Sequence, residues 1–180
     1  MRTEVGLMKH RVWVVGAVAF GVAAVCAKAP VPLSDAERQA LADSVGRIAT
    51  EYITSMTPRV DVARMLSYYE HRPDLVIAGE GMVWVSYDSL AMLAPIEYPA
   101  GSAVTGTLDD KHFTVLSRDV VVLTSRFHAV MKDPAGTETP TQGVLTFVFH
   151  RTSDGWKIAA DHESTAQPAA EPAKPKRGAR

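Results

Sequence analysis

Residues 146–164 read TFVFHRTSDGWKIAADHES, and this stretch decides the fold. β-Branched and aromatic residues on both sides of a short polar break predict two strands. The break, Ser153-Asp154-Gly155, is a tight turn that ends in glycine, so the two strands are antiparallel neighbours. The second strand covers residues 156–163. The C-terminal part of the chain is therefore expected to be a hairpin within a larger antiparallel sheet.

Further strands are expected before this hairpin. The segments with strand composition are residues 74–78, 82–85, 111–116, 120–131 and 143–151. The three-residue connection 117–119 makes its flanking strands antiparallel neighbours. Residues 132–139 contain Pro134 and Gly136 and are expected to form a longer hairpin loop. The last third of the chain is thus predicted to be a meander of long strands.

A long helix is predicted at residues 35–56. Ser34 is a good N-cap, and Glu37 completes an S-x-x-E capping box. The residues that recur at helical spacing on one face are Leu41, Val45, Ile48, Tyr52 and Met56.

Two shorter helices are predicted next. One starts after Asp61 and ends near Arg72, ahead of a proline. The other covers residues 87–94, is capped by Ser86 and is closed by Pro95. Helices first and strands last predict an α+β fold.

The two ends of the chain are expected to lie outside the domain. Residues 1–27 have the pattern of a signal peptide, with a basic cluster at 9–11, an apolar run at 12–25 and Val25-Cys26-Ala27 before the cleavage point. The run is short for a transmembrane helix, and an uncleaved membrane anchor is the alternative. Translation starts at Met1 or Met8. Residues 166–180 are rich in Ala and Pro and are expected to be a disordered tail, which leaves residues 28–165 as the domain.

Charge and cysteine content exclude several functions. The whole chain carries −1, residues 1–27 carry +2 and residues 166–180 carry +3, so residues 28–165 carry −6. An acidic domain argues against a nucleic-acid partner. Cys26 is the only cysteine and is lost with the signal, so no thiol chemistry is expected. The histidines have no i, i+4 helix spacing, and we expect neither a metal nor a cofactor.

The hairpin resembles the last hairpin of the NTF2-like superfamily, in its SnoaL-like and DUF4440-like branches. The resemblance rests on the turn at 153–155 and on Asp161-His162-Glu163-Ser164, and it covers roughly residues 34–165. It implies a curved antiparallel sheet wrapped around the long helix, and a cone-shaped pocket.

Strand alternation selects the first pocket candidates. His162 shares a face with Trp156 and Ile158, so we expect it at the pocket rim or floor, with a purely structural histidine as the alternative. Arg126 and His128 share a face of their strand, which either lines the pocket or faces solvent.

A second resemblance favours a position of the Arg126 side chain inside the pocket. Residues 126–136 (RFHAVMKDPAG), together with 146–151 and 162–164, resemble the association domain of calcium/calmodulin-dependent kinase II. It implies that Arg126 lines the pocket, where a guanidinium pairs with small carboxylates. We then expect Arg126 within reach of His162, with Glu80 as one internal partner. Phe147 stands where that domain has a second arginine.

Ketosteroid isomerases also resemble this layout. The resemblance implies that Tyr52 is the helix-one tyrosine and that Glu80 lies near the position of the base. Tyr52, Tyr69 and Trp84 are pocket candidates, with simple core packing as the alternative.

Three functions remain open from the sequence. The first is an exported domain, periplasmic or secreted, that binds a small molecule, with a carboxylate-bearing ligand as the specific version. The second is an isomerase, dehydratase or cyclase that uses acid–base residues in the same pocket. The third is an interaction module without a ligand. A homodimer is expected in each case, because apolar residues occupy both faces of the strands at 120–131 and 143–151.

We predict export with the loss of residues 1–27. N-terminal sequencing of the extracytoplasmic protein should begin at or near Lys28. A soluble cytoplasmic protein that keeps Met1 or Met8 would contradict this prediction.

Overall fold

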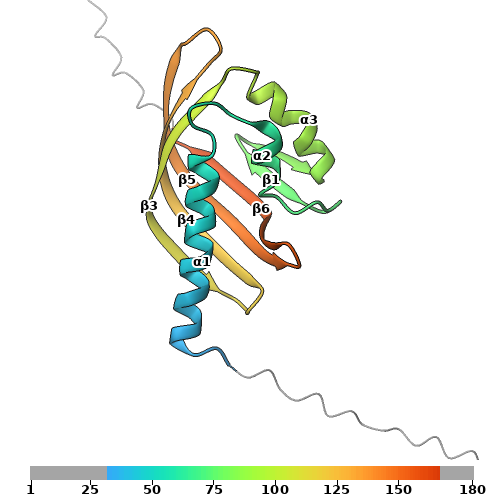
Figure 1. Cartoon of the computed structure of the whole chain (residues 1–180), viewed down its shortest axis with the longest axis vertical. Helices are drawn as coiled ribbons and strands as arrows, with labels where there is room; N and C mark the ends of the chain where they lie inside the picture. Colours follow the sequence, from blue (N-terminus) through green and yellow to red (C-terminus); the bar gives the residue numbers. More distant parts are fainter. Residues whose placement is uncertain (1–31, 167–180) are drawn as a thin grey trace, which may run out of the picture. The chain divides into compact units, whose positions relative to one another are not determined.

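The computed structural model describes residues 32–166, which form one curved six-stranded sheet and three helices (Figure 1). The elements are α1 (Asp35–Thr54), α2 (Val62–Leu66), β1 (Val76–Gly79), β2 (Met82–Val85), α3 (Tyr87–Glu97), β3 (Ala103–Val115), β4 (Val120–Lys132), β5 (Glu138–Thr152) and β6 (Gly155–Thr165). The strand order is β2-β1-β6-β5-β4-β3, and only the β1–β6 pair is parallel. The α+β class and the curved antiparallel sheet expected from the sequence are confirmed.

The capping box on α1 is present as predicted. The backbone N–H of Ser34 donates to Glu37 Oε2 at 2.8 Å, and the backbone N–H of Glu37 donates to Ser34 Oγ at 3.3 Å. These bonds satisfy two amide groups that the helix itself leaves without acceptors. The helix ends at Thr54, two residues before the predicted end.

The two short helices differ from the prediction in where they end. α2 stops at Leu66, not near Arg72, because the chain after it pairs with β6: Ile158 N–H donates to Tyr68 O, and Glu70 N–H donates to Ile158 O. α3 continues through Pro95 to Glu97. A proline in the last turn removes only one helical hydrogen bond, so it did not close the helix at residue 94 as predicted.

The central strands are longer than their composition indicated. β3 begins at Ala103 instead of residue 111, and β5 begins at Glu138 instead of residue 143. The added residues are mostly small or polar, and it is their pairing along β4 that holds them in the sheet. Tertiary pairing therefore overrides weak local strand propensity here.

A β-bulge in β6 reverses the predicted orientation of its last residues. Phe149 pairs with Ile158 and Val148 pairs with Ala160, so Ala159 is an extra residue without a partner. One extra residue moves every later side chain to the other face of the strand. Ile158 faces the core as expected, but beyond the bulge the inward positions belong to Asp161 and Glu163 rather than to His162.

The core lies between α1 and the concave face of the sheet, across which α1 runs (Figure 1). Its largest fully buried side chains include Phe149, Met65, Leu75, Leu123 and Ile158. The helix contributes Val45, Ala49 and Tyr52, and Met56 follows two residues after its end. Burial of this apolar area is the main stabilising contribution to the fold.

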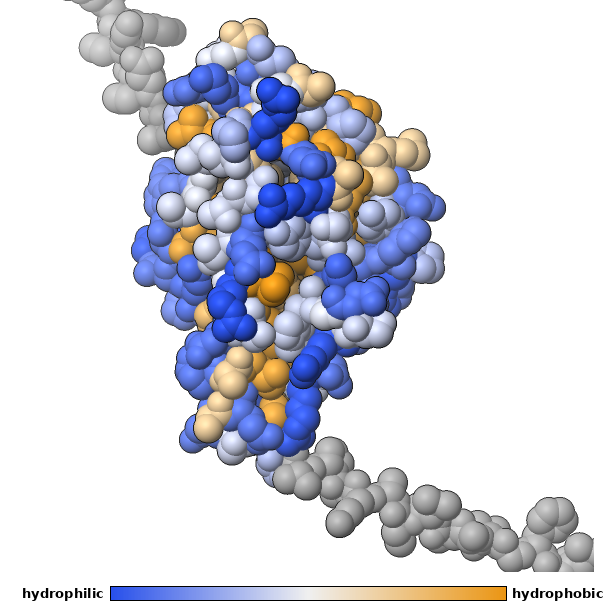
Figure 2. All heavy atoms as spheres, viewed as in Figure 1, coloured by the Kyte–Doolittle hydropathy of each residue, from blue (hydrophilic) through white to orange (hydrophobic). Residues whose placement is uncertain are grey.

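The outer surface is mixed in character. Apolar residues reach the surface among polar ones in the region of α3 (Figure 2), where Met92 and Ile96 are exposed. Within residues 32–166, no helix combines the length and the apolar character needed to cross a membrane. The predicted signal peptide lies outside the described residues, as does the predicted tail beyond Ala166.

We predict that Gly143→Ala lowers the free energy of unfolding by about 2–3 kcal/mol. A Cβ at this position in β5 would overlap the carbonyl oxygen of Ser164 and lie 2.9 Å from Phe127 Cε1. Gly46→Ala in α1 is the control, because its Cβ meets only the ring of Phe113, at 3.1 Å, and alanine favours the helix. Urea unfolding measures both variants. Equal midpoints would contradict the close approach at Gly143.

Candidate functional site

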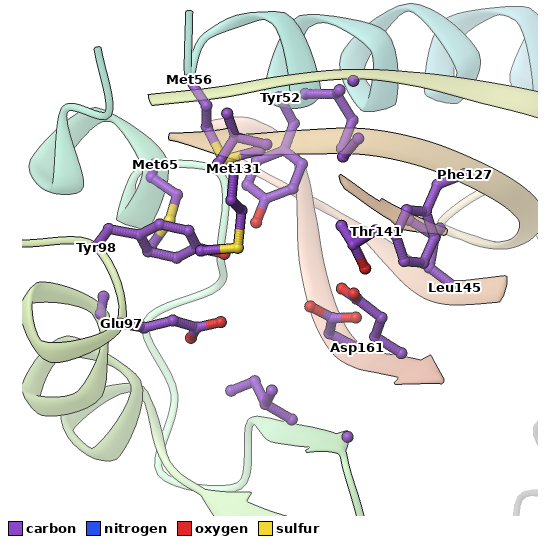
Figure 3. A pocket seen from close by; sticks show the side chains of 18 of the residues that line it. Tyr52, Met56, Met65, Glu97, Tyr98, Phe127, Met131, Thr141, Leu145 and Asp161 are labelled. Atoms are coloured by element: carbon purple, nitrogen blue, oxygen red, sulfur yellow. The ribbon is translucent and has the colours of Figure 1, made fainter. Parts of the chain in front are cut away.

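A cavity of about 470 Å³ opens between α1, α3 and the concave face of the sheet. Most of its wall is apolar, and it includes several methionines and aromatic rings (Figure 3). The apolar wall includes Met56, Met65, Leu90, Val104, Phe127, Met131, Leu145 and Phe147. The polar groups are few and are mainly hydroxyl and carboxyl groups, which makes this the binding-site candidate of the domain.

Two tyrosines and one aspartate form a hydrogen-bonded chain in the wall. The Tyr69 hydroxyl donates to Asp161 Oδ2 at 2.8 Å, and the Tyr52 and Tyr69 hydroxyl oxygens are 3.0 Å apart. Each hydroxyl has a single proton, and the Tyr69 hydroxyl donates its proton in the hydrogen bond to Asp161. Tyr52 is therefore the donor to Tyr69. The chain runs from α1 through the segment after α2 to β6.

Backbone contacts hold this chain in place. Tyr69 forms a parallel β-bridge with Ile158, three residues before Asp161. Tyr52 is 7% exposed, and its ring packs edge-on against the rings of Tyr69 and Phe147. Asp161 pairs across the sheet with Phe147 on β5 and Ile77 on β1. The three polar groups are thus fixed by a helix and by two strand pairings.

The second oxygen of Asp161 has no partner. Asp161 Oδ1 is buried and accepts no hydrogen bond, the only such side-chain atom among the described residues. Burial raises the pKa of Asp161 to about 7, while the hydrogen bond from Tyr69 lowers it and the charges of Glu163 and Glu97 raise it. A carboxyl group with this pKa gains and loses a proton near neutral pH.

Two more carboxyl groups face the same space. Glu163 follows Asp161 on the inward side of β6. The residue is exposed overall, but partial burial of its carboxyl group raises its pKa to about 7, with further contributions from Glu97 and Glu80. Glu97 is the last residue of α3, and burial raises its pKa against a hydrogen bond with Tyr98. Figure 3 shows Glu97 and Asp161 directed toward one another from opposite sides of the cavity.

The tyrosines remain protonated in this setting. Burial raises the pKa of Tyr52, Tyr69 and Tyr98 well above the ordinary value, and the charge of Asp161 adds to the rise in each case. The phenols therefore act as hydrogen-bond donors and not as bases.

Five residues that the sequence selected lie in the cavity wall: Tyr52, Tyr69, Trp84, Glu80 and, at its edge, His128. Glu80 Oε1 accepts a hydrogen bond from the Thr165 hydroxyl at 2.7 Å, and it does not pair with Arg126. Their roles in binding stay predictions.

The expected position of Arg126 is wrong. The inward side of β4 carries Leu123 and Phe127, so Arg126 and His128 are on the outer side. The Arg126 side chain is 64% exposed and pairs with Asp110. His128 touches the cavity wall, but its side chain is 60% exposed and its Nδ1 lies 2.8 Å from Asp109 Oδ2. The arginine that carried the carboxylate-ligand hypothesis is therefore outside the cavity.

His162 is also outside, because of the bulge at Ala159. It is exposed and is not part of the cavity wall. The same bulge explains why sequence analysis missed Asp161 and Glu163, which strict alternation placed on the opposite face. Two small residues in a row, Ala159 and Ala160, were the available sign of an irregular strand. Glu97 and Tyr98 were missed because Pro95 was taken as the end of the helix.

The described residues offer no evident metal site. Within residues 32–166, no group of three or more His, Cys, Asp or Glu side chains could hold a metal ion.

Comparison with known proteins places this geometry in a family context. A family model described as SnoaL-like domain matches residues 45–168. No curated protein sequence matches the chain.

Solved structures share the fold at low sequence identity. A protein described provisionally as an NTF2-like dehydratase, from Streptomyces avermitilis, is 20% identical with a TM-score of 0.63 and covers 72% of this chain and 99% of its own. A provisional scytalone dehydratase from Novosphingobium aromaticivorans is 10% identical with a TM-score of 0.64, over 82% and 100%. A provisional calcium/calmodulin-dependent kinase II association domain from Xanthomonas campestris is 18% identical with a TM-score of 0.56, over 73% and 89%. These likenesses show the NTF2-like fold.

We predict that Asp161→Asn flattens the pH dependence of stability. The raised pKa means that the folded protein holds this proton more tightly than the unfolded chain, so the contribution of Asp161 is most favourable below pH 4 and is lost as the pH rises through about 7. The free energy of unfolding of the native protein should fall relative to the variant by at most about 4 kcal/mol between pH 4 and pH 8. Urea unfolding at several pH values measures the difference. Glu51→Gln, an exposed site on α1, is the control, and parallel profiles for native protein and Asp161→Asn would contradict the prediction.

Proposed function

This chain belongs to the SnoaL-like domain family, and from that premise we propose that it is an enzyme that transfers protons on a small, mainly apolar molecule held in the cavity. One observation carries the proposal. Asp161 lines the apolar cavity, its Oδ1 is buried under protein atoms without a hydrogen-bond partner, and its Oδ2 is fixed by Tyr69. This arrangement suits a general base that is oriented by a second group.

The residues divide into roles by their surroundings. Ionised Asp161 takes a proton through Oδ1, and Tyr69 and Tyr52 stabilise the carboxylate by donating along the chain. Glu163 or Glu97 holds a proton when Asp161 is ionised, because three facing carboxyl groups do not ionise together without a large repulsion. A protonated carboxyl group opposite the base is a general acid.

A base and an acid across one cavity suit two related reactions. In the first, Asp161 removes and keeps a proton from one carbon, the double-bond electrons shift, and the acid donates its own proton to another carbon, which moves the double bond; exchange with solvent restores both groups. In the second, the acid protonates a hydroxyl group that leaves as water, and the electron pair of the broken C–H bond forms the double bond. The two provisional dehydratases of the same fold support the second class. The apolar wall sets the character of the substrate.

Binding without chemistry is the second candidate. The size and apolar wall of the cavity would also suit a carrier of small molecules. The titrating, unpartnered carboxyl group favours the enzyme. Burying such a group destabilises the fold, and a simple carrier does not require it. Export through residues 1–27 and a homodimer remain part of the proposal, and neither is needed for the chemistry.

We predict that the protein accelerates the exchange of α-protons of 2-tetralone in D₂O. This neutral bicyclic ketone presents an acidic C–H bond to a base inside an apolar cavity. The rate, followed by proton NMR above the buffer background, should rise through about pH 7 as Asp161 ionises. Asp161→Asn should lower it by about 100-fold or more. Tyr69→Phe should move the rise to higher pH, because the hydrogen bond that stabilises the carboxylate is lost.

Arg126→Met is the control for this assay. Arg126 lies outside the cavity, so the exchange rate should be unchanged. Equal exchange by the native protein and Asp161→Asn would contradict the role of Asp161, and exchange no faster than in buffer would contradict the proton-transfer function.

A further inference from the structure

We propose that the natural ligand of the cavity carries a protonated amine, and that its ammonium group lies between Asp161, Glu163 and Glu97. The inference rests on the proposed function in one respect, that the cavity is the ligand site. It does not require that the ligand be turned over. It extends the proposal by assigning the charge of the molecule that the cavity takes.

The first ground is the charge of the wall. Among the described residues that line the cavity, four carry carboxyl groups, and none is a lysine or an arginine. Glu80 has the Thr165 hydroxyl as a partner, but Asp161, Glu163 and Glu97 have no cation beside them in the wall. The one histidine of the wall, His128, directs its Nδ1 to Asp109. An anionic ligand would be repelled by these carboxyl groups.

The second ground is the unpartnered oxygen of Asp161. Oδ1 is buried without a donor, and the hydroxyl of Tyr69 is already committed to Oδ2. A buried acceptor without a donor is costly, and a small rotation of the carboxyl group would bring Oδ1 to a donor in the occupied site. An ammonium group has up to three N–H donors and no acceptor, which fits a site that contains several acceptors.

The third ground is the direction from which the carboxyl groups come. Asp161 projects from β6 and Glu97 from the end of α3 on the opposite side (Figure 3). Glu163, also on β6, is a second carboxyl group of the cavity wall. A neutral donor would satisfy Oδ1 but would leave the mutual repulsion of the three groups in place. A positive charge between them removes that repulsion, and the gain is largest at Asp161, because Glu97 and Glu163 are exposed residues whose charges water partly screens.

The rest of the wall selects the body of the molecule. The aromatic rings of Tyr52, Tyr98 and Phe127 face the cavity, and such rings favour both apolar groups and nearby cations. At the wall, Met82 and Ile96 are 54% and 74% exposed, which extends apolar surface outward from the cavity. The expected ligand is therefore an apolar, ring-containing amine and not a short polar one.

Binding of an amine should release protons from the protein. In the empty cavity the facing carboxyl groups reduce their repulsion by holding protons, and burial adds to this. A bound cation favours the ionised forms, so its affinity should increase between pH 6 and pH 8. The tyrosines stay protonated over this range and do not contribute.

Three probes with the same bicyclic frame test the inference: 2-aminotetralin as the cation, 2-tetralol as the neutral molecule and tetralin-2-carboxylate as the anion. Isothermal titration calorimetry at pH 8 with the full chain should show the amine bound at least tenfold tighter than the alcohol, and the carboxylate bound most weakly. Glu163→Gln should weaken amine binding by about tenfold without affecting the alcohol. Glu51→Gln, which removes the same charge outside the cavity, should leave all three affinities unchanged.

The outcomes separate this inference from the proposed function. Equal affinities for amine and alcohol, or an amine preference that Glu163→Gln leaves intact, would overturn the inference even if 2-tetralone exchanges its protons. A preference for the amine that Glu163→Gln removes would support the inference even if no exchange occurs, and the proton-transfer function alone would then be wrong.

Discussion

The site depends on one extra residue in β6. Ala159 has no partner on β5, and this bulge turns Asp161 and Glu163 toward the cavity and His162 away from it. Without the bulge, the pairing that buries Ile158 would place a histidine at the cavity and both carboxyl groups in solvent. The same irregularity brings Asp161 to Tyr69, which is held beside Ile158 by its own β-bridge. Bulges often serve to re-aim a side chain beside a functional site.

The carboxyl groups of the cavity repel one another and are disfavoured by the apolar wall around them. Apolar walls disfavour every charge, yet three carboxyl groups face one another across them, and one oxygen has no donor. Protons resolve the conflict at neutral pH, which is what makes these groups suitable for proton transfer. A cation would resolve it more completely. Both proposals draw on the same arrangement of Asp161, Glu163 and Glu97, but proton transfer needs one of these groups to keep its proton, whereas a bound cation favours their ionised forms.

Much of the framework could be predicted from local patterns. The capping box at Ser34 and Glu37, the helical stripe that includes Tyr52, and the hairpin around Gly155 are each determined by neighbouring residues, so they were found without the structure. Arg126 was misplaced because a resemblance outweighed the burial pattern of its own strand, in which Leu123 and Phe127 mark the inward face. Asp161 and Glu163 were missed because alternation assumes a regular strand.

The sequence by itself determined the α+β class, because hydrophobic periodicity and short-range capping act over a few residues. The final hairpin carried the NTF2-like resemblance, and Tyr52, Tyr69, Trp84 and Glu80 were pocket candidates, with core packing as the alternative for the three aromatic residues. Only the tertiary structure decided which polar groups meet in the cavity. Tyr52, Tyr69, Glu97 and Asp161 come from four separate segments, and their contact depends on a bulge, a β-bridge and the end of a helix, none of which a local pattern specifies.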